Sequence, residues 1–458
     1  MSAPKHLAPL FKMDDGTTIE PETIHSNEVA PSPRLRAAIV MDTLGRLQTF
    51  FPDDRLVDID RLNQGLARDL RAIPLADMGR LRRKHQVREL PPLPSLTHFE
   101  TAVDTSIDSL EPIRFYSGQG EEDLQLPNQQ YQRLLRSVRW LDFTRPLSDI
   151  PVNRRAPDRD ESQLRDALQS FTSLRIRQRL DDTLEIPPMP ETAQKILHLR
   201  MNSNAEVGDL ADIVENDPSL AAQVVSWASS SFYASQTPVS SIYDAIMRVL
   251  GFDLVMNLAM GLSLGRTLKQ PRDQPEGFIG YWTQAIWVAQ ATSVVISLMP
   301  RRERPTFGLC YLSGLLHNFG YLVLAHVFPP HFSLICRYSE VNRHVPAEFV
   351  EQHLLGITRE QIGGILMDLW NMPEEVVLAI RHQNDPYYDG GHHRYANALF
   401  LARALLVERG VRLGPPQEIP DALYERLNLP RERLAEEMDA LLENADQVAS
   451  MAGMLNTG

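Results

Sequence analysis

Hydrophobic and polar positions change their spacing along the chain. Two short apolar runs, Arg36–Met41 and Leu47–Pro52, flank the turn-forming residues Asp42–Gly45, which predicts a β-hairpin. Apolar residues then recur at helical spacing in Leu56–Leu66 and again around Met78–Lys84. The N-terminal part therefore mixes strand and helix patterns.

Further short apolar segments lie at Ile113–Tyr116 and Ser137–Phe143, after which prolines accumulate and apolar periodicity fades. The charged stretch Asp158–Asp182 has one apolar stripe at helical spacing and predicts a connecting helix. The expected parts are an N-terminal extension (1–29), a mixed α/β domain (30–143), a linker with a connecting helix (144–182), a helical domain (183–410) and a helical C-terminal extension (411–458).

Beyond Ile186 the spacing is helical throughout. Asn204 is placed to cap one helix, and Asp217, which precedes a proline, is placed to cap the next. Ser240 or Ser241 opens a third helix. We expect the last stretch, 431–454, to form one acidic amphipathic helix with a solvated charged face.

One apolar segment, Pro305–Cys336, contains no Asp, Glu, Lys or Arg and is long enough to cross a bilayer. His317 and Asn318 interrupt its middle, and two prolines at 329–330 break it. Helices that are apolar all round belong in the centre of large helical folds. The segment therefore predicts two buried helices rather than a membrane span.

Composition narrows the functional classes. The 458 residues are 43% hydrophobic and 23% charged, the balance of a folded protein with more than one domain. A net charge of -13 argues against DNA, tRNA and anionic membranes as partners, and for proteins or small molecules. Cys310 and Cys336 lie in apolar runs, which predicts buried free thiols. Since no secretion signal is recognised in Met1–Asp14, we expect a cytoplasmic protein.

Four motifs follow one another in the helical part. They are Ile186–Pro190 (IPPMP), Ile213–Val225 (IVENDPSLAAQVV), Ala228–Tyr233 (ASSSFY) and Pro238–Gly251 (PVSSIYDAIMRVLG). Their order and spacing closely resemble the HDOD domain family. The resemblance implies an all-helical HD-like fold, a role in bacterial signal transduction, and kinship with HD and HD-GYP phosphohydrolases without a generally established activity.

HD phosphohydrolases bind divalent metals through histidine and aspartate side chains, which activate water against a phosphate. The resemblance places the corresponding positions in Tyr281–Ala285, Gly314–Gly320, Leu355–Gly363 and Ala379–Pro386. Only one of the six residues at these positions, His317, is of a type that binds metal in HD phosphohydrolases. The residues at these positions are Gln284, His317, Asn318, Arg359, Gln383 and Asn384.

Neutral amides bind divalent metals weakly, and Arg359 carries a fixed positive charge. We therefore expect a degenerate site with no catalytic residue, metal or cofactor. Two interpretations of His317 remain: a core histidine bonded to its neighbours, or one member of a six-residue polar pocket for an anionic ligand. Adjacent imidazoles at His392 and His393 rarely converge on one ion, so no metal is expected there either.

The N-terminal part carries a second resemblance, over residues 30–143. Its motifs are Leu35–Asp42, Leu56–Asn63, Leu93–Leu96 and Val103–Ile107, and they look like the YbaK-like aminoacyl-tRNA deacylase domain. In that family a lysine near the start of the first long strand and a glycine-proline loop shape the substrate site. Arg36 stands at the lysine position, and Arg88–Pro91 lacks the glycine. The comparison implies a retained fold used for binding or as a scaffold.

The chain is thus expected to be a two-domain α+β protein. Its function is interpreted as non-enzymatic signalling or regulation through protein partners or a small anionic ligand. Two alternatives are an aminoacyl-tRNA deacylase regulated by the HDOD domain and a sensor of nucleotides or cyclic dinucleotides. A basic face beside Arg36 would favour the first alternative, and a pocket lined by the six polar residues would favour the second.

Overall fold

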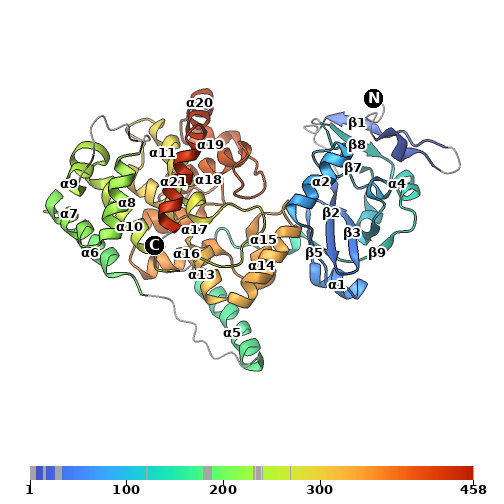
Figure 1. Ribbon diagram of the computed structural model, residues 1–458, viewed down its shortest axis with the longest axis horizontal. Coiled ribbons are helices and arrows are strands. Elements are labelled where there is room, and N and C mark those ends of the chain that lie inside the picture. Colours follow the sequence, from blue (N-terminus) through green and yellow to red (C-terminus); the bar gives the residue numbers. More distant parts are fainter. Residues whose placement is uncertain are drawn as a thin grey trace. The chain divides into compact units, whose positions relative to one another are not determined.

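The chain divides into two units, which are described separately (Figure 1). Unit 1 consists of Met1–Pro151, Gln274–Gly277 and Ser333–Leu354, and unit 2 of Val152–Asp273, Phe278–Phe332 and Leu355–Gly458. The computed structural model describes residues 7–13, 17–25, 33–119, 122–178, 188–230, 233, 239, 241–268 and 270–456.

Unit 1 is built on a mixed sheet with the strand order β1-β8-β7-β2-β3-β6-β9, and β5 pairs with β2. The strands are β1 (Glu22–His25), β2 (Arg34–Asp42), β3 (Gly45–Pro52), β5 (Arg71–Ala72), β6 (Glu100–Asp104), β7 (Ile113–Tyr116), β8 (Glu122–Leu126) and β9 (Arg139–Leu141). The predicted hairpin is confirmed, since β2 and β3 pair antiparallel and Asp42 faces Gly45 at the turn.

Four helices accompany this sheet: α1 (Ile59–Leu66), α2 (Leu75–His85), α3 (Pro94–Thr97) and α4 (Asn128–Leu134). Asp58 caps α1 by accepting a 3.1 Å hydrogen bond from the Arg61 backbone amide. Leu35, Phe50 and Phe115 belong to one buried apolar cluster. A sheet whose buried face is covered in this way is a stable α/β arrangement.

The boundaries of unit 1 differ from those expected at residues 30 and 143. Leu7 and Phe11 are buried in the same apolar cluster, and β1 forms an edge of the sheet, so the presumed extension 1–29 contributes to the core. At the other end, β10 (Thr144–Pro146) pairs with β4 (Arg55–Val57). Prolines suggested a linker there, but strands at sheet edges tolerate proline.

The segment Ser333–Leu354 also belongs to unit 1, which the helical periodicity alone could not reveal. It contains most of α14 (Pro329–Val341) and α15 (Ala347–Leu355). The Asn342 side chain bonds the Val57 backbone amide at 2.7 Å and its carbonyl at 2.9 Å. The Tyr338 hydroxyl donates to Asp58 at 3.0 Å. These buried polar contacts attach the helices to β4 and α1.

Unit 2 is helical over the residues that the structure describes, which confirms the expected two-domain α+β architecture. Its main helices are α5 (Asp160–Gln178), α6 (Glu191–Met201), α7 (Val207–Glu215), α8 (Pro218–Ala228), α9 (Ile242–Asp244), the π-helix Ala245–Leu250, α10 (Phe252–Gly265), α11 (Tyr281–Ser297), α12 (Phe307–Leu316), α13 (Phe319–Val327), α16 (Arg359–Leu369), α17 (Glu374–His382), α18 (His393–Glu408), α19 (Asp421–Arg426), α20 (Arg431–Leu442) and α21 (Ala445–Asn456).

Predicted helix starts in unit 2 were partly right. Asp217 caps α8 and Ser241 caps α9, as expected, while Ser240 and Ile186 lie outside the described residues. The prediction for Asn204 was wrong. Helix α7 begins at Val207, so Glu206 is its cap and forms a capping box with Asp209, while Asn204 lies in the preceding turn.

The C-terminal stretch forms two helices, α20 and α21, and not the single helix predicted. The chain turns at Asn444, whose side-chain amide donates to the Ala440 carbonyl at 3.1 Å. Both helices contact α11, and Met438 and Val448 are fully buried. They are therefore part of unit 2's core.

In the long apolar segment, Phe307–Val327 forms two buried helices, α12 and α13, as predicted, and a third helix, α14, begins at Pro329. Residues Phe307–Val327 have a mean hydropathy of 1.3 in the most apolar 18-residue window, and 89% of that window is buried inside the protein. Cys310 and Cys336 are buried free thiols, as expected. Helix α12 packs very closely on α11, because a Cβ atom on Gly314 would lie 2.5 Å from the Cα atom of Ala289. Only glycine permits this approach.

Candidate functional site

Four segments of unit 2 carry the six positions that correspond to HD metal ligands. Gln284 lies in the first turn of α11, and His317 and Asn318 join α12 to α13. Arg359 begins α16, while Gln383 and Asn384 follow α17. The starts of α13 and α16 are pressed together, since a Cβ atom on Gly320 would lie 1.9 Å from the Arg359 carbonyl oxygen.

Three of these side chains form one continuous hydrogen-bonded series, which we call the amide network. The Gln284 Nε2 atom donates to the Ile279 carbonyl at 2.6 Å, and its Oε1 atom accepts from Asn318 Nδ2 at 3.2 Å. The Asn318 Oδ1 atom then accepts from the Arg359 guanidinium at 3.1 Å. The same guanidinium lies 5.1 Å from the centre of the Tyr321 ring. The side-chain oxygens of Gln284 and Asn318, which could otherwise face a cation, therefore each accept a hydrogen bond.

The other predicted residues, Gln383 and Asn384, form a second set of contacts. Gln383 Nε2 donates to the His317 carbonyl at 2.7 Å and to the Ile380 carbonyl at 3.0 Å. The Asn384 Oδ1 atom accepts from Arg403 of α18 at 2.7 Å. Arg403 was not recognised from the sequence. Its signal was an isolated arginine in the otherwise apolar run Ala398–Leu406.

His317 is buried, with 5% of its surface exposed, and its Nδ1 atom bonds the Gly314 carbonyl at 2.8 Å. Burial, followed by the positive charges of Arg403 and Arg359, lowers the pKa of His317 to about 3. The imidazole is thus neutral at physiological pH. His317 is thus a buried histidine whose ring is hydrogen-bonded to the backbone, the geometry expected of a core histidine.

Within the described part of the chain, no group of three or more His, Cys, Asp and Glu side chains is arranged to hold a metal ion. His392 begins the turn before α18 with a φ of 52°, and its Nε2 atom lies 3.7 Å from the Glu374 carboxylate. Two such groups do not complete a metal site, since structural zinc uses four ligands.

A buried ion pair lies beside the amide network and was not predicted. The Arg381 guanidinium of α17 contacts Asp160 at the start of α5, with 4% and 6% of these side chains exposed. Gln361 donates to the same carboxylate at 2.8 Å, and Arg381 also donates to the Asn153 carbonyl at 2.8 Å. Together they fix the segment 153–160 across the end of α17.

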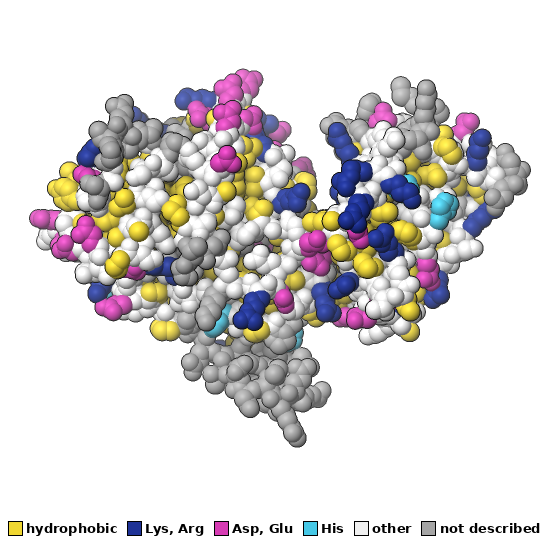
Figure 2. All heavy atoms as spheres, in the orientation of Figure 1, with side chains coloured by type: hydrophobic (Ala, Val, Ile, Leu, Met, Phe, Trp, Pro, Cys, Tyr) yellow, Lys and Arg dark blue, Asp and Glu magenta, His cyan; other side chains and the backbone are white. Residues whose placement is uncertain are grey.

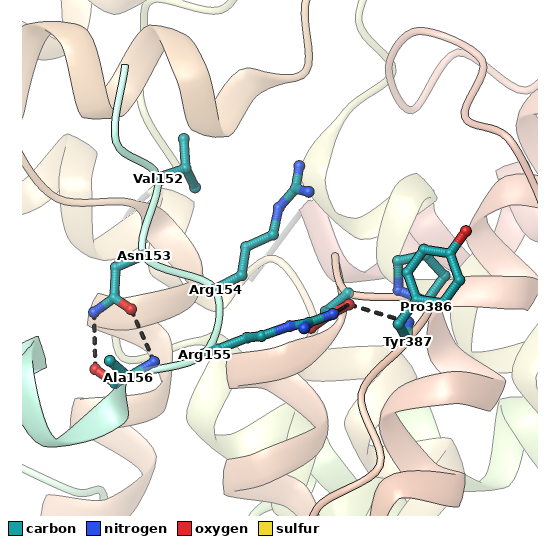
Figure 3. A pocket seen from close by; sticks show the side chains of 8 residues that line it. Val152, Asn153, Arg154, Arg155, Ala156, Pro386 and Tyr387 are labelled. Carbon is teal, nitrogen blue, oxygen red and sulfur yellow. Dashed lines mark hydrogen bonds and ion pairs between the residues drawn. The ribbon is translucent and has the colours of Figure 1, made fainter. Parts of the chain in front are cut away.

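This segment also borders a hollow of about 430 Å³, shown in Figure 3. Its lining residues are Val152, Asn153, Arg154, Arg155, Ala156, Asp385, Pro386 and Tyr387. Arg155 bonds both oxygens of Asp385, at 2.7 and 3.2 Å, whereas the Arg154 side chain extends away from that pair in the view. The Tyr387 ring is 54% exposed. Three of the lining residues, Asp385, Pro386 and Tyr387, directly follow Asn384 in sequence.

Arg36, the candidate residue of unit 1, lies on β2. Its guanidinium contacts both carboxylate oxygens of Glu89, at 3.2 and 3.1 Å. About a third of the Arg36 side chain and nearly half of the Glu89 side chain are exposed. A guanidinium lacks the amine that a lysine would supply, and here it is also paired with Glu89.

Comparison with known proteins identifies the helical region. A family model for the HDOD domain matches residues 186–386. The crystal structure of a candidate signal-transduction protein from Marinobacter aquaeolei VT8 is 49% identical and superposes with a TM-score of 0.90 over 99% of both chains.

Two more distant similarities were found. A candidate phosphohydrolase structure from Shewanella amazonensis SB2B is 21% identical, covers 59% of this chain and 95% of its own, and has a TM-score of 0.47. An uncharacterized protein of Treponema pallidum (strain Nichols) is 25% identical over 222 residues, which span 46% of this chain and 40% of that protein. This chain, with an HDOD domain at residues 186–386, belongs to the same family as the Marinobacter protein.

Proposed function

We propose that this chain is a non-enzymatic regulator that works in signalling through binding, with a degenerate HD site. The HDOD domain and the Marinobacter relative support a signalling or regulatory role. The amide network is the observation that carries the non-enzymatic part. Its oxygens already accept hydrogen bonds from Asn318 and Arg359 at the positions that correspond to metal ligands.

Electrostatics supports the same proposal. A divalent cation would have to displace the Arg359 guanidinium from Asn318. The neutral amide of Asn318 would then bind the cation more weakly than a carboxylate would. His317 points its Nδ1 atom at a backbone carbonyl, and the positive charges of Arg403 and Arg359 already surround it. A water molecule at this place would therefore have no metal to activate it.

Elemental analysis of the purified full-length protein tests the proposal. We expect no stoichiometric iron, manganese or zinc after a chelator wash, and no hydrolysis of cyclic dinucleotides when manganese is added back. One or more metal ions per chain that survive the wash, together with hydrolysis, would contradict it.

A sensor of small anions is the second candidate, because Arg154 and Arg155 line a hollow in unit 2. None of the six ligand-like positions lines this hollow, so it is a different pocket from the one that the sequence predicts. Its volume of about 430 Å³ lies in the range of small-molecule sites, and arginine is a strong phosphate donor. Binding of nucleotides and cyclic dinucleotides should be screened with Arg154→Gln, which should weaken any ligand bound there. Arg301→Gln, an exposed residue elsewhere in unit 2, is the matched control.

For unit 1 we propose a YbaK-like fold retained for binding or as a scaffold. Arg36 supports this, because it supplies no amine at the lysine position and its guanidinium is paired with Glu89. The proposed partners of the whole chain are cytoplasmic signalling proteins. DNA, tRNA and membranes are not proposed as partners, since the net charge is -13.

A further inference from the structure

The strongest local charge lies on unit 1, at the end of α2. Residues 79–88 contain five Lys and Arg residues and no Asp or Glu, although the chain carries a net charge of -13. Arg82, Arg83, Lys84 and Arg88 are all exposed. Figure 2 shows Lys and Arg side chains gathered over α2. The net charge of the whole chain does not reveal this local excess of Lys and Arg, whereas the net charge of ten-residue windows does.

We call these four exposed side chains the basic cluster. Arg46 and Arg80 pair with Asp77 of the same helix, at 2.7 and 3.0 Å. Arg82, Arg83, Lys84 and Arg88 have no acidic partner among the residues that the structure describes. Most arginines of unit 1 have an acidic partner, so the basic cluster is an exception. Its four positive charges repel one another.

Helix stability does not account for the cluster. Cations in the last turn of a helix do favour its dipole, and Arg82, Arg83 and Lys84 lie there. The helix ends at Gln86, however, where φ is 56°, and Arg88 lies beyond the reach of that effect. Each further like charge adds repulsion while the benefit to one helix end saturates.

Three residues of the basic cluster, Arg82, Arg83 and Arg88, line a hollow at the protein surface. The hollow measures about 480 Å³ and is lined by Arg82, Arg83, Gln86, Val87, Arg88 and Gln119. The Arg88 backbone amide donates to the Gly118 carbonyl at 2.7 Å. Gly118 has a φ of +87°, and a Cβ atom there would lie 2.7 Å from Val87 Cγ1. The loop therefore packs tightly beneath the cations.

We infer that the basic cluster binds an acidic segment of a partner protein. Its four cations occur within seven residues, so they match a few closely spaced carboxylates. Guanidinium groups take carboxylates in a bidentate manner, and the Gln86 and Gln119 amides add neutral donors or acceptors at the rim. Charge complementarity of this kind favours fast, salt-sensitive and reversible association, which suits a regulatory contact.

The compactness of the cluster favours a protein segment over the other polyanions. Nucleic acids are usually held by an extended stripe of cations that contacts several phosphates, whereas these four cations lie within seven residues. Because Arg88 precedes Glu89, the partner of Arg36, binding of RNA to the cluster would favour the deacylase alternative instead. A membrane is an extended plane, which so compact a cluster would contact at one point only. This site is separate from the amide network and goes beyond the proposed function, so either proposal can fail alone.

Fluorescence anisotropy with the full-length protein tests the inference. The probe is a labelled peptide of about twelve residues that alternates glutamate with serine, and its neutral counterpart has glutamine in place of glutamate. We expect the acidic peptide alone to bind, and its affinity to fall several-fold between about 50 and 200 mM salt. The double variant Arg83→Gln with Arg88→Gln should bind about tenfold more weakly.

The matched control is Arg301→Gln with Arg302→Gln, which removes the same charge from exposed positions of unit 2. It should leave the affinity unchanged. Equal loss in both double variants would mean general charge attraction and would overturn the inference. So would tighter, cluster-dependent binding of an oligouridylate of equal charge, since the site would then belong to a nucleic acid. Unchanged thermal unfolding of both variants excludes misfolding as the cause.

Discussion

Asn318 occupies the position at which the HD signature has an aspartate, and its Oδ1 atom accepts from Arg359 at 3.1 Å. If this were the only missing ligand, Asn318→Asp would restore metal binding and phosphodiesterase activity together. We expect neither, because Gln284, Gln383 and Asn384 still supply no imidazole. The new carboxylate should form an ion pair with Arg359 instead. Calorimetric titration with manganese and an assay on cyclic dinucleotides measure both properties. Tight manganese binding by this single variant would show that the other ligand positions are misplaced.

His317 should make stability depend on pH. Its pKa in the folded protein is lowered to about 3, mainly by burial, whereas an unfolded histidine has a pKa near 6.5. Between these values the unfolded chain binds more protons, so stability falls as pH decreases below about 6.5. At pH 5 the loss from this residue is roughly 2 kcal/mol. Urea unfolding at about pH 7.5 and 5 should show that His317→Gln loses less stability than the parent. An identical loss in both proteins would refute the assignment.

Arg36 should not support catalysis in unit 1, because Glu89 holds its guanidinium. The full-length protein is expected to deacylate mischarged tRNA no faster than the uncatalysed background, and its tRNA affinity should be weak and salt-sensitive. Arg36→Ala should behave the same way. Turnover by the parent that disappears in Arg36→Ala would establish the deacylase alternative.

Among the elements, α5 depends on one buried contact for its position. Asp160→Ala would leave the Arg381 guanidinium buried without its carboxylate, which costs about 3–5 kcal/mol. Asp160→Leu with Arg381→Met removes both charges and should cost much less. Urea unfolding followed by circular dichroism compares the three proteins. Equal destabilisation by the single and the double variant would mean that packing, and not the ion pair, holds the helix start.

How far the elements could be predicted depended on how local their signals are. The hairpin turn at Asp42–Gly45 and the cap at Asp217 were correct, because each involves residues within a few positions. The cap predicted at Asn204 was wrong, since the helix begins two positions later, after a turn that the hydrophobic spacing does not reveal. The contact between Asp160 and Arg381 spans 221 positions and leaves no periodic trace. The six ligand-like positions came from family resemblance, whereas their hydrogen bonds came only from the fold.

At the scale of the whole molecule, unit 1 is discontinuous in sequence. Its sheet contacts Ser333–Leu354 through buried groups that include Asn342. An isolated fragment 1–151 should therefore unfold at a lower temperature than unit 1 does in the full chain. Adding a synthetic peptide of residues 333–354 should raise that temperature in a concentration-dependent way. Differential scanning calorimetry measures both, and a peptide with Asn342→Ala is the matched control. A fragment that melts like the full-length unit and ignores the peptide would show that these helices are dispensable.

The same discontinuity sets an order of events during synthesis. Roughly 180 residues separate Pro151 from Ser333. At about 5–20 residues per second the ribosome needs roughly 10 to 40 seconds to translate them. Throughout that interval the nascent sheet has emerged, but the helices that bond Val57 have not yet been made. The surface around β4 is then open to chaperones, so a slow codon run within the intervening region would prolong the stage at which this protein is most exposed to aggregation.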